Sequence, residues 1–177
     1  LSALLKQKGH RTQLLFLSTI EDVRRRANYK SYSFSEKIFD QVAERCQESD
    51  LIGISLMSHH YTVAVELTKA LKQRLDKNII WGGIHPTVCP EECIMTADLV
   101  CVGEAETSLI ELVSRIDKGE DVNGVMGIWN KRDGQIVKNG AGPLAHALDN
   151  LPFPDYSFQD HHIIVNGELQ PMTITNW

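Results

Sequence analysis

The chain has 177 residues, of which 42% are hydrophobic and 23% are charged, a composition typical of a globular domain rather than of a disordered chain. Its net charge of −5 provides no basic surface for nucleic acid, and the basic run Arg24–Arg26 favours a solvated face over a phosphate site. No apolar stretch approaches the roughly 20 residues that a membrane span needs. We therefore expect neither nucleic acid nor a membrane among its partners.

The first residues predict a helix, a strand and a second helix. Residues 1–9 carry leucines on one face and end in Gly9, a pattern typical of a short amphipathic helix. Residues 12–17 are a continuous apolar run, which predicts a buried strand, and a long polar connection follows over residues 18–33. From Phe34 onward apolar residues recur at helical spacing, and Ser33 or Ser35 is the expected N-cap.

The middle of the chain alternates strands and helices. We expect strands over residues 50–56, 78–81 and 98–102, and helices over residues 61–75, 90–95 and 103–117. Continuous apolar strands separated by helices are the pattern of a parallel sheet that is covered on both faces. Residues 1–122 therefore predict an α/β three-layer domain with a Rossmann- or flavodoxin-like doubly wound parallel sheet.

One strand of this fold is missing from the sequence pattern. A doubly wound domain normally opens on a strand, whereas this chain opens on a helix. In a flavodoxin-like strand order the absent first strand would be central. We expect that it precedes Leu1 in the natural protein or that another segment takes its place.

The pattern changes after Gly124. Two short strand-like runs flank Asp133-Gly134, a dipeptide typical of a tight hairpin turn, so residues 123–150 predict a β-hairpin extension. Two prolines in residues 151–156 prevent regular structure and predict a linker over residues 151–177. Within this linker we expect His161 and His162 to be exposed, and residues 163–165 and 172–175 to have strand character.

A candidate ligand slot lies where two of the predicted strands end. Ser55 closes one apolar strand, and Gly82-Gly83 closes the next. Carboxyl ends of parallel strands form the ligand-binding edge of open α/β sheets. A serine offers a hydroxyl group, and glycines let the backbone approach a planar heterocycle closely. We therefore expect a flat or elongated ligand between these two loops.

Histidines and carboxylates near the strand ends leave alternatives open. For His59-His60 a metal pair is less favoured than a helix entry with one ring facing the ligand, because adjacent residues on a helix point in different directions. For His85 a ligand contact and a plain turn residue remain equally open. Glu104 and Glu106 begin a helix, so we interpret them as capping groups rather than as an acid–base pair.

Four cysteines have neither a disulfide-framework spacing nor a zinc-finger spacing: Cys46, Cys89, Cys93 and Cys101. Zinc at Cys89 and Cys93 would need two further ligands nearby, so buried or partly buried free thiols are the better interpretation. Cys101 is expected in the core. Free thiols indicate a reducing compartment, and we expect a cytoplasmic protein.

Taken together, the motifs resemble the N-terminal cobalamin-binding domain of cobalamin-dependent radical S-adenosylmethionine proteins. The residues that carry the resemblance are Gly9-His10, Gly53 to Met57, Gly82 to Thr87, Pro90 to Glu92, Asp98 to Glu106, and Leu151 to Tyr156. The resemblance implies that cobalamin inserts its nucleotide tail beside Ser55, Leu56, Met57, Ser58, His59, Gly82, Gly83, Ile84, His85, Val102, Gly103 and Glu104. Met57 replaces a leucine of the family motif and keeps an apolar wall of similar volume.

The same resemblance implies partners and cofactors outside this sequence. The family's Asp-x-His-x-x-Gly motif, whose histidine ligates cobalt, is absent, so no residue is assigned as a metal ligand. A C-terminal radical S-adenosylmethionine barrel in cis would hold a [4Fe-4S] cluster and S-adenosylmethionine on a Cys-x-x-x-Cys-x-x-Cys triplet, which this chain lacks. We therefore expect a fragment that is not catalytic alone, within an enzyme of methyl transfer or related radical chemistry.

Two other functions compete with this interpretation. The first alternative is a Rossmann-like interaction or scaffold domain that does not bind cobalamin. A phosphorylated receiver domain shares the architecture, but the predicted strand ends offer no phosphoacceptor aspartate.

Overall fold

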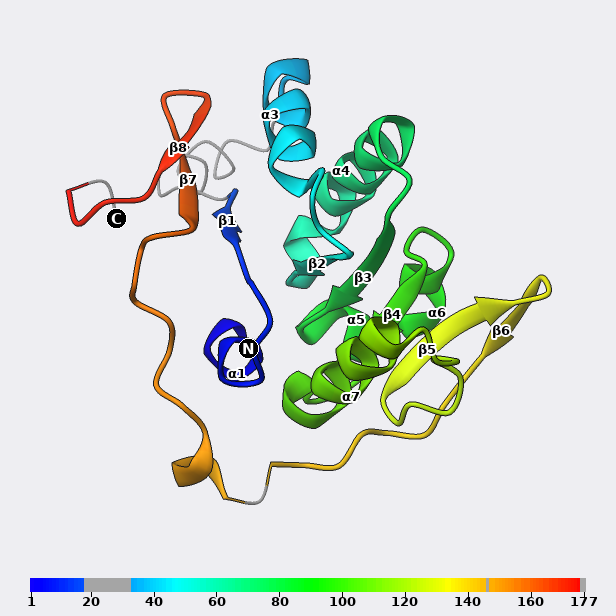
Figure 1. The fold of residues 1–177 in the computed structure, drawn as a ribbon. Helices are drawn as coiled ribbons and strands as arrows, with labels where there is room; N and C mark the ends of the chain where they lie inside the picture. Colours follow the sequence, from blue (N-terminus) through cyan, green and yellow to red (C-terminus); the bar gives the residue numbers. More distant parts are fainter. Residues whose placement is uncertain (18–32, 146, 176–177) are drawn as a thin grey trace.

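The computed structural model describes residues 1–17, 33–145 and 147–175. The predicted polar connection up to residue 32, with Arg24–Arg26, lies outside the described residues. The strands form two sheets (Figure 1). The larger has the order β2 (Leu51–Ser55), β3 (Asn78–Gly82), β4 (Leu99–Cys101), β5 (Ile128–Arg132) and β6 (Gln135–Val137).

The larger sheet confirms the predicted α/β class. Its strands β2, β3 and β4 are parallel, and β5 and β6 continue the sheet in antiparallel order. The hairpin turn is Asp133-Gly134, as predicted, and both residues have positive φ, of 50° and 77°. This conformation is the one that a tight two-residue hairpin turn requires.

Most of the predicted helices form at the expected positions. The helices are α1 (Ser2–Gln7), α3 (Glu36–Cys46), η1 (Ser58–His60), α4 (Tyr61–Arg74), α5 (Ile84–Val88), α6 (Pro90–Ile94), α7 (Ala105–Lys118) and η2 (Leu148–Asn150). Ser35 is the N-cap of α3, and its hydroxyl accepts a hydrogen bond from the Ile38 amide at 3.4 Å. The short helix α5 was not predicted. None of the described helices is long and apolar enough to cross a membrane.

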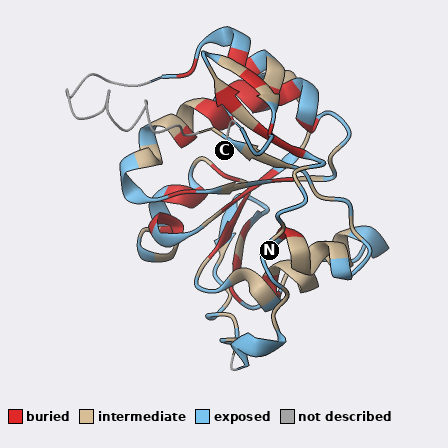
Figure 2. Ribbon diagram, turned by 90° about the vertical axis from the view of Figure 1, so that its left-hand side faces the viewer, coloured by how far each residue is buried: buried red, intermediate tan, exposed pale blue. Residues whose placement is uncertain are grey.

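Two hydrophobic clusters cover opposite faces of the larger sheet and make three layers. Ile79, Trp81 and Val100 pack with α3, α4 and α6 in one cluster. Their neighbours along the strands, Ile80 and Leu99, pack with α7 in the other. Successive residues of a strand point to opposite faces, so this division follows directly from the continuous apolar sequence. Buried residues accordingly lie along the strands and on the inner faces of the helices (Figure 2).

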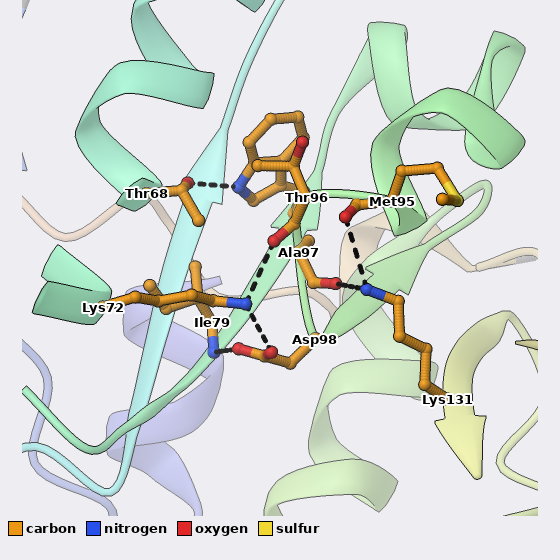
Figure 3. Close-up of polar contacts among 9 residues, drawn as sticks. Thr68, Lys72, Ile79, Met95, Thr96, Ala97, Asp98 and Lys131 are labelled. Atoms are coloured by element: carbon orange, nitrogen blue, oxygen red, sulfur yellow. Dashed lines mark hydrogen bonds and ion pairs between the residues drawn. The ribbon is translucent and has the colours of Figure 1, made fainter. Parts of the chain in front are cut away.

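A polar network holds the amino-terminal ends of β3 and β4 together (Figure 3). The Asp98 carboxylate accepts hydrogen bonds from the Ile79 amide at 2.9 Å and from Lys72 of α4 at 2.5 Å. Lys131 of β5 donates to the carbonyl oxygen of Ala97 at 3.1 Å. These contacts join α4, β3, the turn before β4 and β5, and they leave the opposite ends of the strands free to form a site.

The smaller sheet corrects three of the sequence predictions. It has the order β1 (Leu14–Phe16), β7 (His161–Val165) and β8 (Glu168–Pro171). The strand β1 is an edge strand whose residues are half-buried or exposed, not a buried strand as predicted. The predicted strand character of residues 172–175 is also wrong, because β8 ends at Pro171.

The third correction concerns His161 and His162, which are buried rather than exposed. Only 2% and 6% of these residues is accessible to solvent. They lie in β7, which is the central strand of the smaller sheet, with β1 on one side and β8 on the other. The His161 ring also lies beside the rings of Phe16 and Phe158. Burial of the pair follows from this central position.

Among the described residues, no strand pairs with the outer edge of β2. The expected central strand is therefore not supplied by β1, which belongs to the other sheet. As a result Gly53 and Ser55 of β2 are exposed, whereas all three residues of β4 are buried. The two sheets nevertheless share one core, since Ile164 and Leu169 of the smaller sheet belong to the same cluster as Ile52 of β2.

Candidate functional site

The loops that follow β2 and β3 are joined directly by backbone hydrogen bonds. Ser55 and Gly82 are partners in the parallel register of the two strands. Beyond them the Leu56 amide donates to the Gly82 carbonyl at 3.0 Å, and the His85 amide donates to the Leu56 carbonyl at 3.3 Å. The structure thus brings the two predicted loops together at one edge of the sheet.

Gly83 is required by its contact with the neighbouring loop. Its φ is +99°, and a Cβ at this position would lie 2.9 Å from the Leu56 carbonyl oxygen and 3.1 Å from the Ser55 Oγ. Both the conformation and the space therefore demand glycine. At Gly82, by contrast, a Cβ would make an ordinary contact of 3.7 Å with Cys101.

A third loop, after β4, is tied to the Gly83 loop by Thr87. The Thr87 hydroxyl donates to the Gly83 carbonyl at 2.8 Å and accepts from the Gly103 amide at 3.1 Å. Thr87 was not among the predicted site residues, although it ends the Gly82 to Thr87 run that carries the resemblance. Three loops at the carboxyl ends of β2, β3 and β4 form one connected surface.

Apolar side chains project from this surface into solvent. Met57 is 52% exposed, Ile84 is 61% exposed and Val88 is 64% exposed. Ser55 and Gly83 are also exposed, and Leu56 is buried beneath them. Large apolar side chains that gather at the ligand-binding edge of a sheet indicate an interaction surface.

The histidines of the site have two different roles. His59 and His60 lie in η1, which leads directly into α4, and this confirms the predicted helix entry. His85 lies in α5 and is buried, so it is not a plain turn residue. Its Nδ1 is 3.1 Å from the Ser58 Oγ, a hydrogen bond that links the loop after β3 to η1.

Val102 and Glu104 connect the third loop to the segments that precede and follow the hairpin, respectively. The Val102 amide donates to the Gly127 carbonyl at 2.7 Å. Glu104 is the N-cap residue of α7, but its side chain makes no capping hydrogen bond and instead accepts from the Ala145 amide at 2.7 Å. Glu104 therefore occupies the predicted capping position, but its carboxylate bonds to a different segment instead of to the helix. Glu106 does lie in the first turn of α7, as predicted.

All four cysteines have free thiols, as predicted. Burial raises the pKa of Cys46, Cys93 and Cys101 to about 11. At neutral pH these three thiols are protonated core groups. Cys89 differs from them because it is only half-buried.

The part of the chain that forms this edge of the sheet matches a known protein family. The model of the B12 binding domain matches residues 1–113, which include all three loops of the candidate site. The chain belongs to the B12-binding domain family. Membership in this family agrees with the predicted resemblance and with the α/β fold.

Curated relatives of this B12-binding domain are longer proteins. Over 117 residues it is 32% identical to an uncharacterized methyltransferase of Pyrococcus horikoshii, covering 62% of this chain and 25% of the relative. It is 30% identical over 117 residues to the anaerobic magnesium-protoporphyrin IX monomethyl ester cyclase of a Synechocystis species, covering 64% of this chain and 23% of the relative. The chain thus spans about a quarter of the length of these relatives.

Solved structures share the fold of this B12-binding domain. The radical S-adenosylmethionine methyltransferase TsrM of Kitasatospora setae, with cobalamin and a [4Fe-4S] cluster bound, has a TM-score of 0.63 at 16% identity, over 99% of this chain and 28% of TsrM. The cobalamin-dependent S-adenosylmethionine radical enzyme OxsB, with aqua-cobalamin and S-adenosylmethionine bound, has a TM-score of 0.54 at 17% identity, over 74% of this chain and 22% of OxsB.

Proposed function

We propose that this chain binds cobalamin on the surface formed by the loops after β2, β3 and β4. The observation that carries the proposal is the set of exposed apolar side chains, Met57, Ile84 and Val88, around exposed Ser55 and Gly83 at the carboxyl edge of a parallel sheet. Family membership supports it independently.

The residues of this surface fit an amphiphilic ligand of that kind. Ser55 offers an exposed hydroxyl group to the nucleotide tail, and Met57 and Ile84 offer apolar contact. Gly83 and Gly103 expose backbone without side chains, so a ligand can approach closely. The remaining predicted site residues shape or flank the loops: Leu56, Ser58, His59, Gly82, His85, Val102 and Glu104.

The direct contact between the loops after β2 and β3 changes the direction from which we expect the ligand to approach. Leu56 and Gly82 are hydrogen-bonded to each other, and Gly83 packs on Leu56. A ligand therefore reaches Ser55 from the exposed side of β2 rather than by passing between the loops. Exposure of Gly53 and Ser55 on that strand supports this route.

We further propose that the chain is the cobalamin-binding part of a larger radical S-adenosylmethionine protein in the cytoplasm. In this proposal residues 1–122 form the cobalamin domain and residues 123–150 form the hairpin extension. Residues 151–177 pack on the same core through β7 and β8 and then lead toward a barrel in cis. That barrel would carry the [4Fe-4S] cluster and S-adenosylmethionine. The names of the relatives support this arrangement. Cobalamin supplies a cobalt atom that can carry a methyl group. The loops after β2, β3 and β4 would bind and orient the cobalamin.

The experiment that tests cobalamin binding uses two exposed methionines as a matched pair. Met57 lies on the proposed surface, and Met95, which is 71% exposed, follows α6 near the opposite ends of the strands. Hydroxocobalamin is added to the full chain, and the visible spectrum is recorded after desalting. We expect retained corrin absorbance, at least about tenfold weaker binding by Met57→Glu because a charge is placed in an apolar contact, and unchanged binding by Met95→Glu.

Two outcomes would contradict the proposal. Complete loss of colour from the unmodified chain would favour an interaction or scaffold domain that does not bind cobalamin. Equal weakening by the two substitutions would place the ligand elsewhere. Circular dichroism of both variants checks that neither substitution unfolds the chain.

A further inference from the structure

A second cluster of chemically active side chains lies behind the candidate cobalamin surface. One ring nitrogen of His85, the Cys89 Sγ and a carboxylate oxygen of Glu92 lie within 4.8 Å of one another. His85 is buried, Cys89 is half-buried and Glu92 is exposed, so the cluster opens to solvent on one side. From the sequence alone, zinc at Cys89 and Cys93 lacked the two further ligands that it would need.

The backbone explains why these three residues meet. Cys89 ends α5 and precedes Pro90, the first residue of α6. A residue before proline is disfavoured in the helical conformation, and Cys89 has φ −131° and ψ 54°. The bend at Cys89 separates two one-turn helices and brings Glu92 of α6 toward His85 of α5.

A buried nitrogen that makes no hydrogen bond points to a ligand in this cluster. His85 Nε2 is buried and makes no hydrogen bond with any residue that the structure describes. It lies 3.6 Å from the Glu92 Oε2, and 7% of the His85 side chain is exposed. The other nitrogen, Nδ1, is 3.1 Å from the Ser58 Oγ. If Nδ1 donates its proton to Ser58, Nε2 presents a lone pair toward a carboxylate, an arrangement that a cation between them would stabilise.

We propose that His85, Cys89 and Glu92 bind a divalent transition-metal ion of the zinc type. Nitrogen, sulfur and oxygen together suit zinc or cobalt(II) better than magnesium or calcium, which prefer oxygen alone. A neutral imidazole, a thiolate and a carboxylate sum to a charge of −2, which a divalent ion neutralises. Three protein ligands leave the fourth tetrahedral position to water.

The geometry requires only a small adjustment. Metal–ligand bonds of roughly 2.0 to 2.3 Å place tetrahedral ligands about 3.3 to 3.8 Å apart, so the cluster would contract by about 1 Å. Glu92 is exposed and Cys89 is half-buried, and both side chains can move by rotation about their χ angles. The ring centroids of Tyr61 and His85 lie 4.9 Å apart, so Tyr61 packs on the imidazole.

The neighbouring thiol is not part of this site. Cys93 lies one turn beyond Cys89, but it is fully buried. Among the cysteines near α5 and α6, Cys89 is therefore the one that solvent and an ion can reach. The site does not depend on cobalamin, because none of its three ligand atoms belongs to the exposed apolar surface. A bound ion would fix α6 to α5, the helix that begins after Gly83.

The test uses the tag-free, cobalamin-free full chain titrated with cobalt(II) chloride, followed by zinc(II). We expect one cobalt ion per chain, a thiolate-to-cobalt charge-transfer band, and loss of the band when zinc displaces cobalt. Cys89→Ser should abolish the band, and Glu92→Gln should weaken binding about tenfold or more. Cys46→Ala, which removes a buried thiol of α3, should change neither the charge-transfer band nor the affinity for cobalt.

Three results would overturn the proposal. They are the absence of a charge-transfer band, a band that persists in Cys89→Ser, and binding of several cobalt ions that Glu92→Gln does not affect. Because His85 is buried and its replacement can unfold the chain, the exposed Glu92 carries the ligand test. Zinc should also raise the melting temperature of the unmodified chain but not that of Cys89→Ser. Each readout is independent of cobalamin, so failure here leaves the proposed function intact.

Discussion

At the scale of single residues, the glycines after β3 and β4 differ in why the fold requires glycine. One position has no room for a side chain, and the other requires only a positive φ. Gly83 and Gly103 both have positive φ, of 99° and 91°. Only Gly83 has backbone atoms of another loop within 3.1 Å of a would-be Cβ. Gly103 has nothing within 4 Å. The two positions therefore separate steric contact from backbone strain.

We expect Gly83→Ala to lower the free energy of unfolding by about 1 to 2 kcal/mol more than Gly103→Ala does. At either position alanine is strained by the positive φ of the backbone. At Gly83 its Cβ would also clash with the Leu56 carbonyl and the Ser55 hydroxyl. Urea denaturation of the two variants measures the difference. Equal destabilisation would show that the loop after β2 yields without cost.

The sequence placed Ser55 and Gly83 correctly at strand ends but did not predict their contacts. Ser55 and Gly83 could be placed at strand ends because the apolar runs before them are clear. That Gly83 packs on Leu56, and that Thr87 links Gly83 to Gly103, depends on register between strands far apart in the chain. These strands are apolar on both faces, so they lack the alternation from which a register could be predicted.

At the scale of elements, α1 is attached to the proline-containing segment through Asp155. The Asp155 carboxylate lies 2.8 Å from the Lys6 Nζ and accepts a hydrogen bond from the Ser2 hydroxyl at 2.7 Å. Only 7% of the Asp155 side chain is exposed. The Lys6 ammonium, followed by hydrogen bonds from Ser2 and Ser157, holds the pKa of Asp155 well below its usual range.

This lowered pKa predicts a pH-dependent contribution to stability. A carboxyl whose pKa is lower in the folded state stabilises the fold above its unfolded pKa of about 3.9, and the contribution is lost as the pH falls further. We expect Asp155→Asn to destabilise the chain by about 1 to 2 kcal/mol at pH 7. The difference in the free energy of unfolding between the unmodified chain and Asp155→Asn should narrow below about pH 4. Urea denaturation of both at several pH values measures this difference.

A control for this prediction is Asp149→Asn, which changes an exposed aspartate of η2. It should have little effect at any of these pH values. A gap between the unmodified chain and Asp155→Asn that stays constant from pH 7 to pH 3 would contradict the account of Asp155.

The hairpin that β7 and β8 form after residue 150 was not predicted from the sequence. The hairpin of β7 and β8 turns at Asn166-Gly167, with φ values of 53° and 78°, and this dipeptide is as strong a turn signal as Asp133-Gly134. The prolines at 152 and 154 predict irregular structure only for the segment that precedes this hairpin. Parallel pairing of β1 with β7 joins residues 14 and 161, and no local pattern predicts so distant a contact.

At the scale of the whole molecule, the two sheets each present an unpaired edge, β1 in one and β2 in the other, among the described residues. Figure 1 shows β1 on the side of the smaller sheet that faces β2. The sequence predicted that a central strand was missing from this domain. A strand placed between β1 and β2 would join the sheets, and this remains a prediction.

The open edge predicts a difference in hydrogen exchange. β3 is paired on both sides, with β2 and β4, whereas β2 is paired only with β3. We expect backbone amides of residues 51–55 to exchange faster than those of residues 78–82, because unpaired amides are open to solvent. Peptide-level hydrogen exchange followed by mass spectrometry measures both. Equal protection would show that another strand covers β2 in solution.

The most direct test of cobalamin binding compares two corrinoids by equilibrium dialysis against the full chain. Hydroxocobalamin carries the nucleotide tail that the surface around Ser55 and Gly83 is proposed to hold, and cobinamide lacks it. We predict one cobalamin bound per chain and cobinamide bound at least about tenfold more weakly, a difference of about 1.4 kcal/mol. Absence of bound cobalamin, or equal affinity for the two corrinoids, would contradict the account.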